Sequence, residues 1–408
     1  VLAFITVHVD FLFSNEQLKT VSPDLLVKNS KLTTTLLSTL AQSILTLTTI
    51  TFSSIMIVLT TFSGQFSPRT LQTFIADRAS QRVLAVFTAG FVYNAVTLLL
   101  TGQSNSKSLL ITPMFSVISG ICCAAFFIYF IHHVAKWVQV NHLIDNITKK
   151  TLTTVDNVGN EAAHFNSKTK SSIDAKNKAR HVIPAKSAGY IELINFRALL
   201  KIARACDITI EMQVHIGDYV LAGTTIAAYS GNEPLDDQNQ DKIRTAVKLA
   251  TERTSEQDIE FGIQQLVEIA LRAISPAVND PHTAINCINR IGTIISHLSQ
   301  TAMPGPYIYD PDGNHRLTIS TRDMEHFLYK GLYQIRHYGK GDISVTVGML
   351  RAIKRLAETT DTNTRKLLAD FVKYVREGFD DEVLQEKDRM YLQKETEDVL
   401  RLLKGGLL

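Results

Sequence analysis

The stretch LLSTLAQSILTLTTITFSSIMIVLTTF, from Leu36 to Phe62, contains no charged residue and decides the fold class of this chain. Two more apolar stretches follow it, VLAVFTAGFVYNAVTLLL at Val83–Leu100 and LLITPMFSVISGICCAAFFIYFIHHV at Leu109–Val134, and neither contains Asp, Glu, Lys or Arg. A helix needs roughly 20 apolar residues to cross the hydrocarbon core of a bilayer. The sequence therefore predicts membrane-spanning helices rather than the buried core helices of a soluble protein.

The opening residues, VLAFITVHVDFLF, are apolar but form only a short stretch. They have neither the basic region nor the small-residue cleavage site of a signal peptide. We therefore expect them to be the outer end of another span, whose start lies outside this sequence. The fold class predicted is an α-helical membrane domain over residues 1–137, followed by an α+β region. Its four spans are expected at residues 1–13 (in part), 36–62, 83–100 and 109–137.

Lysine and arginine set the expected orientation, because they concentrate in cytoplasmic loops. The loop after the second span carries three arginines and lysine is frequent after Trp137, whereas the loop Thr101–Ser108 has only Lys107. We predict that both termini and the large C-terminal region lie in the cytoplasm. The three lysines of Ser14–Lys31, external in this scheme, oppose it.

The whole-chain composition points to neither nucleic acid nor a cofactor. Charged residues make up 20% of the chain and the net charge is only +3, without the basic excess of a nucleic-acid-binding protein. The four cysteines form no disulfide framework and no CxxC metal pair, and the histidines lack zinc-ligand spacing. We therefore expect no cofactor, no metal and no nucleic-acid partner.

Beyond the spans the chain divides into three regions. Residues 138–182 are predicted to be an amphipathic stalk helix and a polar linker. From Gly189 the pattern changes to strands, in GYIELINFRALLKIA and ITIEMQVHIGDYVLAGTTIAAYS, with Gly217 and Gly223 at turns. The part VHIGDYVLAGTTIAAYS resembles the barrel-sandwich domain of biotinyl and lipoyl carriers and membrane-fusion adaptors, but without the modified lysine. We expect a small β-rich, barrel-sandwich-like module at residues 183–232.

Residues 233–408 are predicted to form a helical bundle. IYDPDGNHRLTIS interrupts it as a hairpin with Asp312 and Gly313 at the turn. Apolar residues at three-to-four spacing predict helices at Lys242–Thr254, Asp258–Ile274, Pro281–Leu298, Asp323–His337, Ile343–Thr359, Thr364–Arg376 and Arg389–Leu403.

Two segments carry candidate functional residues. In SGQFSPRTLQTFIADRASQRVLAVF, which follows the second span, Arg69, Asp77 and Arg78 fit an interfacial anchor that contacts lipid phosphate. They also fit a ring of charge at a pore mouth.

The second segment is DIEFGIQQLVEIALRAISPAVNDPHTAINCINRI, from Asp258 to Ile291. Asp280 is a natural N-cap before Pro281, so the segment fits a purely structural helix–turn–helix. The alternative is a pocket for a small anionic ligand at the new helix N-terminus. The candidate residues are Asp258, Arg272, Ser275, Asn279, Asp280, His282 and Thr283. No catalytic or metal motif accompanies them, so we expect no enzyme activity.

Two motifs together carry a resemblance to a known family. QFSPR…F..DR..Q.VLA.F…VY at Gln65–Tyr93, with DI.FGI.QL..IALRAISPA.NDP.TA at Asp258–Ala284, resembles DUF2254, a bacterial family of predicted membrane proteins of unknown function. The resemblance implies an N-terminal membrane domain and a soluble C-terminal domain, and assigns no activity. With the expected orientation, it implies a protein of the bacterial inner membrane. His282 departs from the apolar or hydroxyl residue expected after Asn-Asp-Pro.

These observations favour an oligomeric channel whose cytoplasmic domain senses a ligand. Spans that are rich in Ser and Thr and free of charge suit a pore lining, and a basic inner loop favours anions. The alternative is a membrane-anchored scaffold or sensor that conducts nothing. The expected partners are the lipid bilayer, further copies of this chain and a small anionic ligand.

Overall fold

The computed structural model of the chain describes residues 2–13, 30–65, 78–102, 111–137, 139–168, 179–231, 233–379 and 384–405. They fall into two compact units, Val1–His142 and Leu143–Leu408, and each unit is described by itself.

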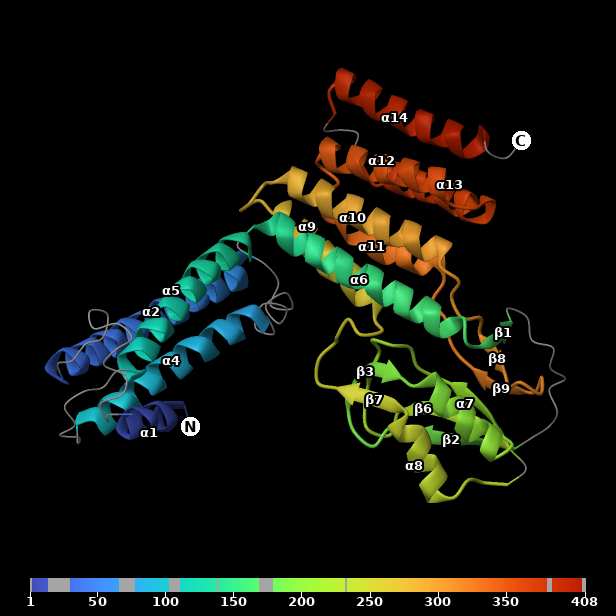
Figure 1. The fold of residues 1–408 in the computed structure, drawn as a ribbon. Helices are drawn as coiled ribbons and strands as arrows, with labels where there is room; N and C mark the ends of the chain where they lie inside the picture. Colours follow the sequence, from blue (N-terminus) through green and yellow to red (C-terminus); the bar gives the residue numbers. More distant parts are fainter. Residues whose placement is uncertain are drawn as a thin grey trace. The chain divides into compact units, whose positions relative to one another are not determined.

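The first unit consists of apolar helices (Figure 1). They are α1 (Leu2–Phe13), α2 (Ser30–Gln65), α4 (Arg78–Gly102) and α5 (Ile111–Trp137). Three stretches are long and apolar enough to cross a membrane: Leu32–Thr60, Ala79–Thr101 and Thr112–Lys136. The prediction of three apolar N-terminal helices is confirmed. A fourth span is not confirmed, because α1 has 12 residues, fewer than the roughly 20 that a span needs.

The three long helices pack around a small apolar core and leave apolar side chains on the outside. The core consists of Ile44, Val83, Phe87, Cys123 and Phe130. Ile57, Ile121 and Ile128 are exposed, which suits a protein whose solvent is lipid, because lipid tails are as apolar as these side chains.

The described part of the second unit contains two β-sheets. The larger has the order β1-β8-β9-β4-β6-β2 and the smaller the order β5-β3-β7. Among the described strands, all pairings are antiparallel except that of β4 with β9, which is parallel. The strands are β1 (Asn166–Lys168), β2 (Ala179–Pro184), β3 (Gly189–Ile194), β4 (Thr209–Met212), β5 (Tyr219–Val220), β6 (Thr225–Gly231), β7 (Val247–Ala250), β8 (Tyr307–Tyr309) and β9 (His315–Thr318).

A self-contained barrel-sandwich module at residues 183–232 is not confirmed. Strands β1, β8 and β9, from outside that range, complete the larger sheet, and β7 completes the smaller one. The predicted strand over Gly189–Ala203 is also wrong in its second half, where α7 (Phe196–Ala205) forms instead. Asn195 caps this helix, and Leu199 and Ala203, four residues apart, are its buried face.

The helix predicted at Lys242–Thr254 is also wrong in its second half, where β7 forms. Helix α8 (Asp237–Thr245) starts earlier, at the cap Asp236, and ends before β7. Val247 and Leu249 leave the helical pattern because they pair with Ile194 and Ile191 of β3. Ladder hydrogen bonds therefore override the local helical spacing.

The remaining helices follow the predicted pattern closely, and the predicted hairpin forms as β8 and β9. These helices are α9 (Ile259–Ala273), α10 (Pro281–Gln300), α11 (Met324–Tyr338), α12 (Ile343–Thr359), α13 (Thr362–Glu377) and α14 (Glu386–Gly405). Within residues 138–182, predicted as a stalk helix and a linker, helix α6 (Val140–Ala162) forms and buries Leu143, Ile147 and Val155 in the second unit. Figure 1 shows α6 beside the sheets, and its Thr151 faces Gly262 of α9.

Candidate functional site

A cleft of about 360 Å³ opens in the second unit between the sheets and the ends of α6, α9, α10 and α11. Most of its lining is apolar, with Ile194, Phe196, Met212, Val214, Ile259 and Phe327 among the lining residues. One wall is polar and includes His215, Asp258, Glu260, Ser320, Arg322 and Asp323. An apolar cavity with a few convergent polar groups is the usual form of a small-molecule site.

The parallel pairing of β4 with β9 brings distant residues to one wall of the cleft. Ile210 of β4 lies opposite Leu317 of β9, and parallel strands end at the same edge of a sheet. His215 follows the end of β4 and Ser320 follows the end of β9. Their side chains meet there, with Ser320 Oγ 2.7 Å from His215 Nε2.

His215 and Asp218 are held by the tight turn between β4 and β5. Asp218 Oδ2 accepts a hydrogen bond from the His215 backbone N–H at 2.8 Å and lies 3.3 Å from His215 Nδ1. Gly217, between them, has φ +87°, a conformation that is easy only for glycine. The turn therefore fixes the position of the imidazole ring.

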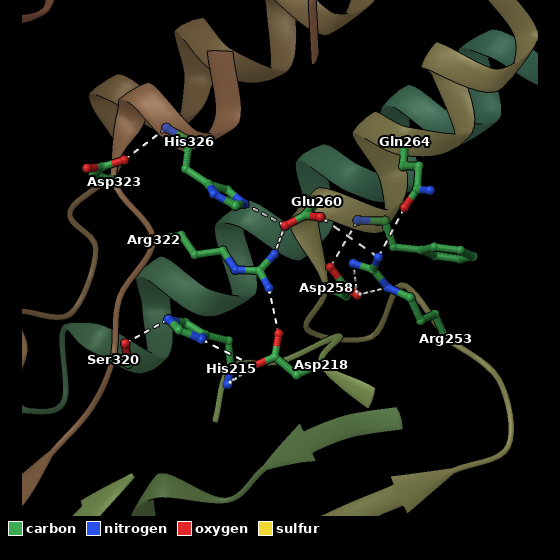
Figure 2. A network of polar contacts seen from close by, with 11 residues as sticks. His215, Asp218, Arg253, Asp258, Glu260, Gln264, Ser320, Arg322, Asp323 and His326 are labelled. Carbon is green, nitrogen blue, oxygen red and sulfur yellow. Dashed lines mark hydrogen bonds and ion pairs between the residues drawn. The ribbon is translucent and has the colours of Figure 1, made fainter. Parts of the chain in front are cut away.

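Arg322 joins this turn to the start of α9 (Figure 2). Its Nη2 donates to Asp218 Oδ1 at 2.9 Å, and its Nη1 forms an ion pair with Glu260. His326 Nε2 lies 2.7 Å from the same Glu260 carboxylate. One buried carboxylate thus ties together a loop, α9 and α11.

Arg253 and Asp258 form the other half of the network (Figure 2). Arg253 Nε donates to Asp258 Oδ2 at 2.8 Å, and Arg253 Nη1 donates to Gln264 Oε1 at 3.0 Å. Asp258 Oδ1 accepts from the Phe261 N–H and so caps α9. Burial raises the pKa of Asp258, and the nearby Arg253 opposes that effect.

Burial also acts on the cations of the wall. It lowers the pKa of Arg322 and that of His326, and the Arg322 charge lowers the pKa of His326 further. A neutral His326 donates its Nε2–H to Glu260. Burial raises the pKa of Glu161, which also lines the cleft. The described lining thus holds the carboxylates of Glu161, Asp258, Glu260 and Asp323 against the single guanidinium of Arg322.

The candidate residues chosen from the sequence at Asp258–Ile291 do not form one site. Asp258 belongs to the cleft, while Arg272 lies in the last turn of α9, about 20 Å away along a helix that rises 1.5 Å per residue. Ser275, Asn279, His282 and Thr283 lie with Arg272 at the turn before α10.

At that turn, the predicted cap is confirmed. Asp280 accepts from the Thr283 N–H at 3.1 Å and from the Thr283 hydroxyl at 2.6 Å. These bonds lower the pKa of Asp280. Asn279 adopts φ +52° to let the chain reverse. Of the loop candidates, Arg69 and Asp77 lie outside the described residues, and Arg78 is the first residue of α4.

The sequence did not point to His215, Asp218, Arg253, Glu260 or Arg322. His215 and Ser320 are 105 residues apart, and no spacing rule connects them. The sequence signal that could have pointed to them was the polar residues in the two turns that follow the predicted strands, one at His215 and the other at Ser320.

Comparison with known proteins identifies a family and several relatives of this chain. A family model described as predicted membrane protein (DUF2254) matches residues 1–355. Uncharacterized proteins of Mycobacterium bovis and of two strains of Mycobacterium tuberculosis are 30% identical over 350 residues, which is 83% of this chain and 67% of theirs. No solved structure matches.

Proposed function

Because this chain belongs to the DUF2254 family of predicted membrane proteins, we propose that it is a membrane-embedded receptor whose second unit binds a small ligand with an apolar body. The cleft between the sheets and the helix ends carries this proposal, since it combines about 360 Å³ of space with apolar walls and one polar wall. The protein sits in a bacterial inner membrane, with the second unit in the cytoplasm.

The cleft joins elements that a ligand can hold together. It is lined by α6, which directly follows the spans in the sequence, and by the starts of α9 and α11. A ligand that bridges these elements stabilises their bound arrangement by its differential affinity for it. That gives a sensor a means of passing ligand occupancy to α6.

A cavity-filling substitution tests the receptor. Ala162 lines the cleft, whereas its neighbour Ala163 is exposed and does not line it. With a saturating neutral aromatic alcohol as the probe, wild type and Ala163→Phe in lipid nanodiscs should melt at higher temperature than without it. At 100 times Kd, a bound ligand adds about 2.7 kcal/mol of stability. Ala162→Phe should lose that shift, and an equal shift in all three proteins would reject the cleft.

Permeation through a homo-oligomer is a second candidate, supported by buried polar groups in the first unit. Asn94, Thr97 and Ser116 are fully buried, and Asn94 Oδ1, Thr97 Oγ1 and Ser116 Oγ have no hydrogen-bond partner in the described part of the chain. Gly90 of α4 faces Ser119 of α5. Because the two helices are antiparallel, Asn94, one turn after Gly90, lies level with Ser116, one turn before Ser119. Polar groups at such depth are costly in a membrane and mark pathways.

The hydroxyls of α2 give the pore less support. Ser43 and Ser54 each donate to the carbonyl four residues earlier, at 2.8 Å, as most hydroxyls in spans do. Ion flux into liposomes separates the candidates. If the protein is a channel, Asn94→Leu should abolish the flux without changing ligand binding. The double variant Arg69→Glu with Arg78→Glu should reduce the preference of the flux for anions. A receptor without a pore gives no flux in any variant.

A further inference from the structure

Three residues at the polar wall of the cleft have the geometry of a serine nucleophile, its base and the group that orients the base. Ser320 Oγ lies 2.7 Å from His215 Nε2. On the other side of the ring, His215 Nδ1 lies 3.3 Å from Asp218 Oδ2. Figure 2 shows them in line, Ser320 to His215 to Asp218. This constellation recurs on unrelated folds and is recognised by its geometry, not by sequence order.

The supporting contacts fix the imidazole for this role. Because Nδ1–H donates to the carboxylate, Nε2 has its lone pair free to accept the Ser320 hydroxyl proton. Asp218 is itself held twice, by the His215 backbone N–H at 2.8 Å and by Arg322 Nη2 at 2.9 Å. Ser320 is exposed, and both Ser320 and His215 line the cleft. A bound molecule therefore has access to both reacting groups.

We propose that Ser320, His215 and Asp218 hydrolyse a carboxylic ester whose apolar acyl group occupies the cleft. This inference rests on the cleft being the ligand site proposed above. The carboxylates of Glu161, Asp258, Glu260 and Asp323 line the cleft against the single guanidinium of Arg322. Arg253, which does not line the cleft, pairs with Asp258. The carboxylates still outnumber the two guanidiniums and disfavour anions, so the substrate is a neutral or cationic ester and not a phosphorylated or carboxylated one.

The reaction proceeds in two balanced halves. Ser320 Oγ attacks the ester carbonyl as its proton moves to His215 Nε2, and the bond to the alcohol oxygen breaks as that proton passes to the departing alcohol. Water then attacks the acyl-serine, giving a proton to the same nitrogen. The acyl–oxygen bond breaks, the carboxylic acid leaves, and Ser320 regains its proton. Ser320 and His215 are the catalytic residues, and Asp218 and Arg322 are positioning residues.

The test uses the full chain in lipid nanodiscs and two probes. An alkyl fluorophosphonate without charge should modify Ser320 covalently, as read by mass spectrometry of its peptide. p-Nitrophenyl hexanoate should be turned over, and Ser320→Ala should lose both signals. Ser344→Ala is the matched control, because Ser344 is also an exposed serine of the second unit but does not line the cleft. It should keep both signals.

The variant Asp218→Asn tests whether Asp218 positions His215 for catalysis or only supports the fold. It should lower kcat on the order of 10²- to 10⁴-fold with KM little changed, because it disturbs the tautomer of the base and not the binding of the acyl group. Hexanamide, which resists hydrolysis, should raise the melting temperature of wild type and of Ser320→Ala alike.

The outcomes distinguish the two proposals. If hexanamide raises the melting temperature but Ser320 is neither labelled nor needed for turnover, the hydrolase proposal is wrong and the receptor proposal is still supported. If neither hexanamide nor an aromatic alcohol binds, both proposals fail. Turnover that persists in Ser320→Ala also refutes the hydrolase.

Discussion

At the scale of single residues, Gly217 shows how closely the wall of the cleft is built. Its φ is +87°, and a Cβ there would collide with Asp258 Oδ2 and lie 2.6 Å from Arg253 Nη2. Gly223 has nearly the same φ, +88°, but nothing within 4 Å of the position of a Cβ. The two glycines thus share one backbone requirement and differ in their surroundings.

We expect Gly217→Ala to destabilise the protein more than Gly223→Ala. Both substitutions meet the positive-φ penalty, roughly 1–2 kcal/mol for a residue with a Cβ. Only the first also pushes apart the Arg253–Asp258 pair, whose groups are buried and costly to leave unpaired. Thermal unfolding of both variants measures the difference. Equal losses would mean that the network tolerates displacement.

His326 predicts a dependence of stability on pH. Its pKa is lowered in the folded protein by burial and by Arg322, so the unfolded chain takes up the proton first as pH falls. Stability from this group is therefore full above the ordinary value of about 6.5 and is lost as pH drops below it.

Melting temperatures measured between pH 7.5 and 5.5 check this expectation. His326→Gln keeps a donor for Glu260 but has no titrating ring, so it should lose less stability than wild type over that range. Other histidines, such as His315 with its pKa also lowered by burial, act equally in both proteins. Parallel curves for the two proteins would contradict the role of His326.

At the scale of elements, α6 and α9 cross at a point with no room for a side chain. Gly262 of α9 faces Thr151 of α6, and a Cβ on Gly262 would collide with Thr151 Oγ1. The Thr151 hydroxyl in turn donates to the Ile147 carbonyl at 2.8 Å. The close approach of the two helices therefore depends on one glycine, a feature that hydropathy does not reveal.

Gly262→Ala should destabilise the protein by about 1–3 kcal/mol, the usual range for an overpacked core. Gly292→Ala is the control, since its Cβ would meet only Ala352 Cβ at the ordinary distance of 3.8 Å. It should be neutral or stabilising, because alanine favours a helix over glycine. Thr151→Ala should recover part of the loss in Gly262→Ala. No recovery in the double variant would place the strain elsewhere.

At the scale of the whole molecule, the sequence gives direct evidence on orientation in the membrane. The apolar stretches indicate where the chain enters lipid, and the segments richer in lysine and arginine are expected on the cytoplasmic side. Every proposal about a cytoplasmic ligand depends on this assignment of the second unit to the cytoplasmic side.

Labelling of introduced cysteines tests the orientation. In a chain whose Cys122 and Cys206 are replaced by serine, cysteines are placed at Gln103, which lies outside the described residues, and at Asn314, exposed in the β8–β9 turn. An impermeant maleimide added to spheroplasts should label position 103 only, and inverted vesicles should show the reverse. Labelling of both positions from outside overturns the orientation.

The sequence by itself determined the features that depend on neighbours a few residues apart. Uncharged stretches such as Leu36–Phe62 indicated the spans, because transfer into lipid depends on local composition. Apolar residues at helical spacing located α9 and α10 within a few residues, and the cap at Asp280 marked the start of α10. The turn at Gly313, with φ +83°, followed in the same way.

Only the tertiary structure decided α7, β7 and the candidate site. Val247 and Leu249 became a strand because β3 lies beside them. A self-contained barrel-sandwich module is not confirmed, because β8 and β9 join the larger sheet from far along the chain. Likewise, the parallel pairing of Ile210 with Leu317 carries His215 to Ser320. Closing a loop of that length costs entropy that only the assembled core offsets, so no local pattern encodes which turns meet.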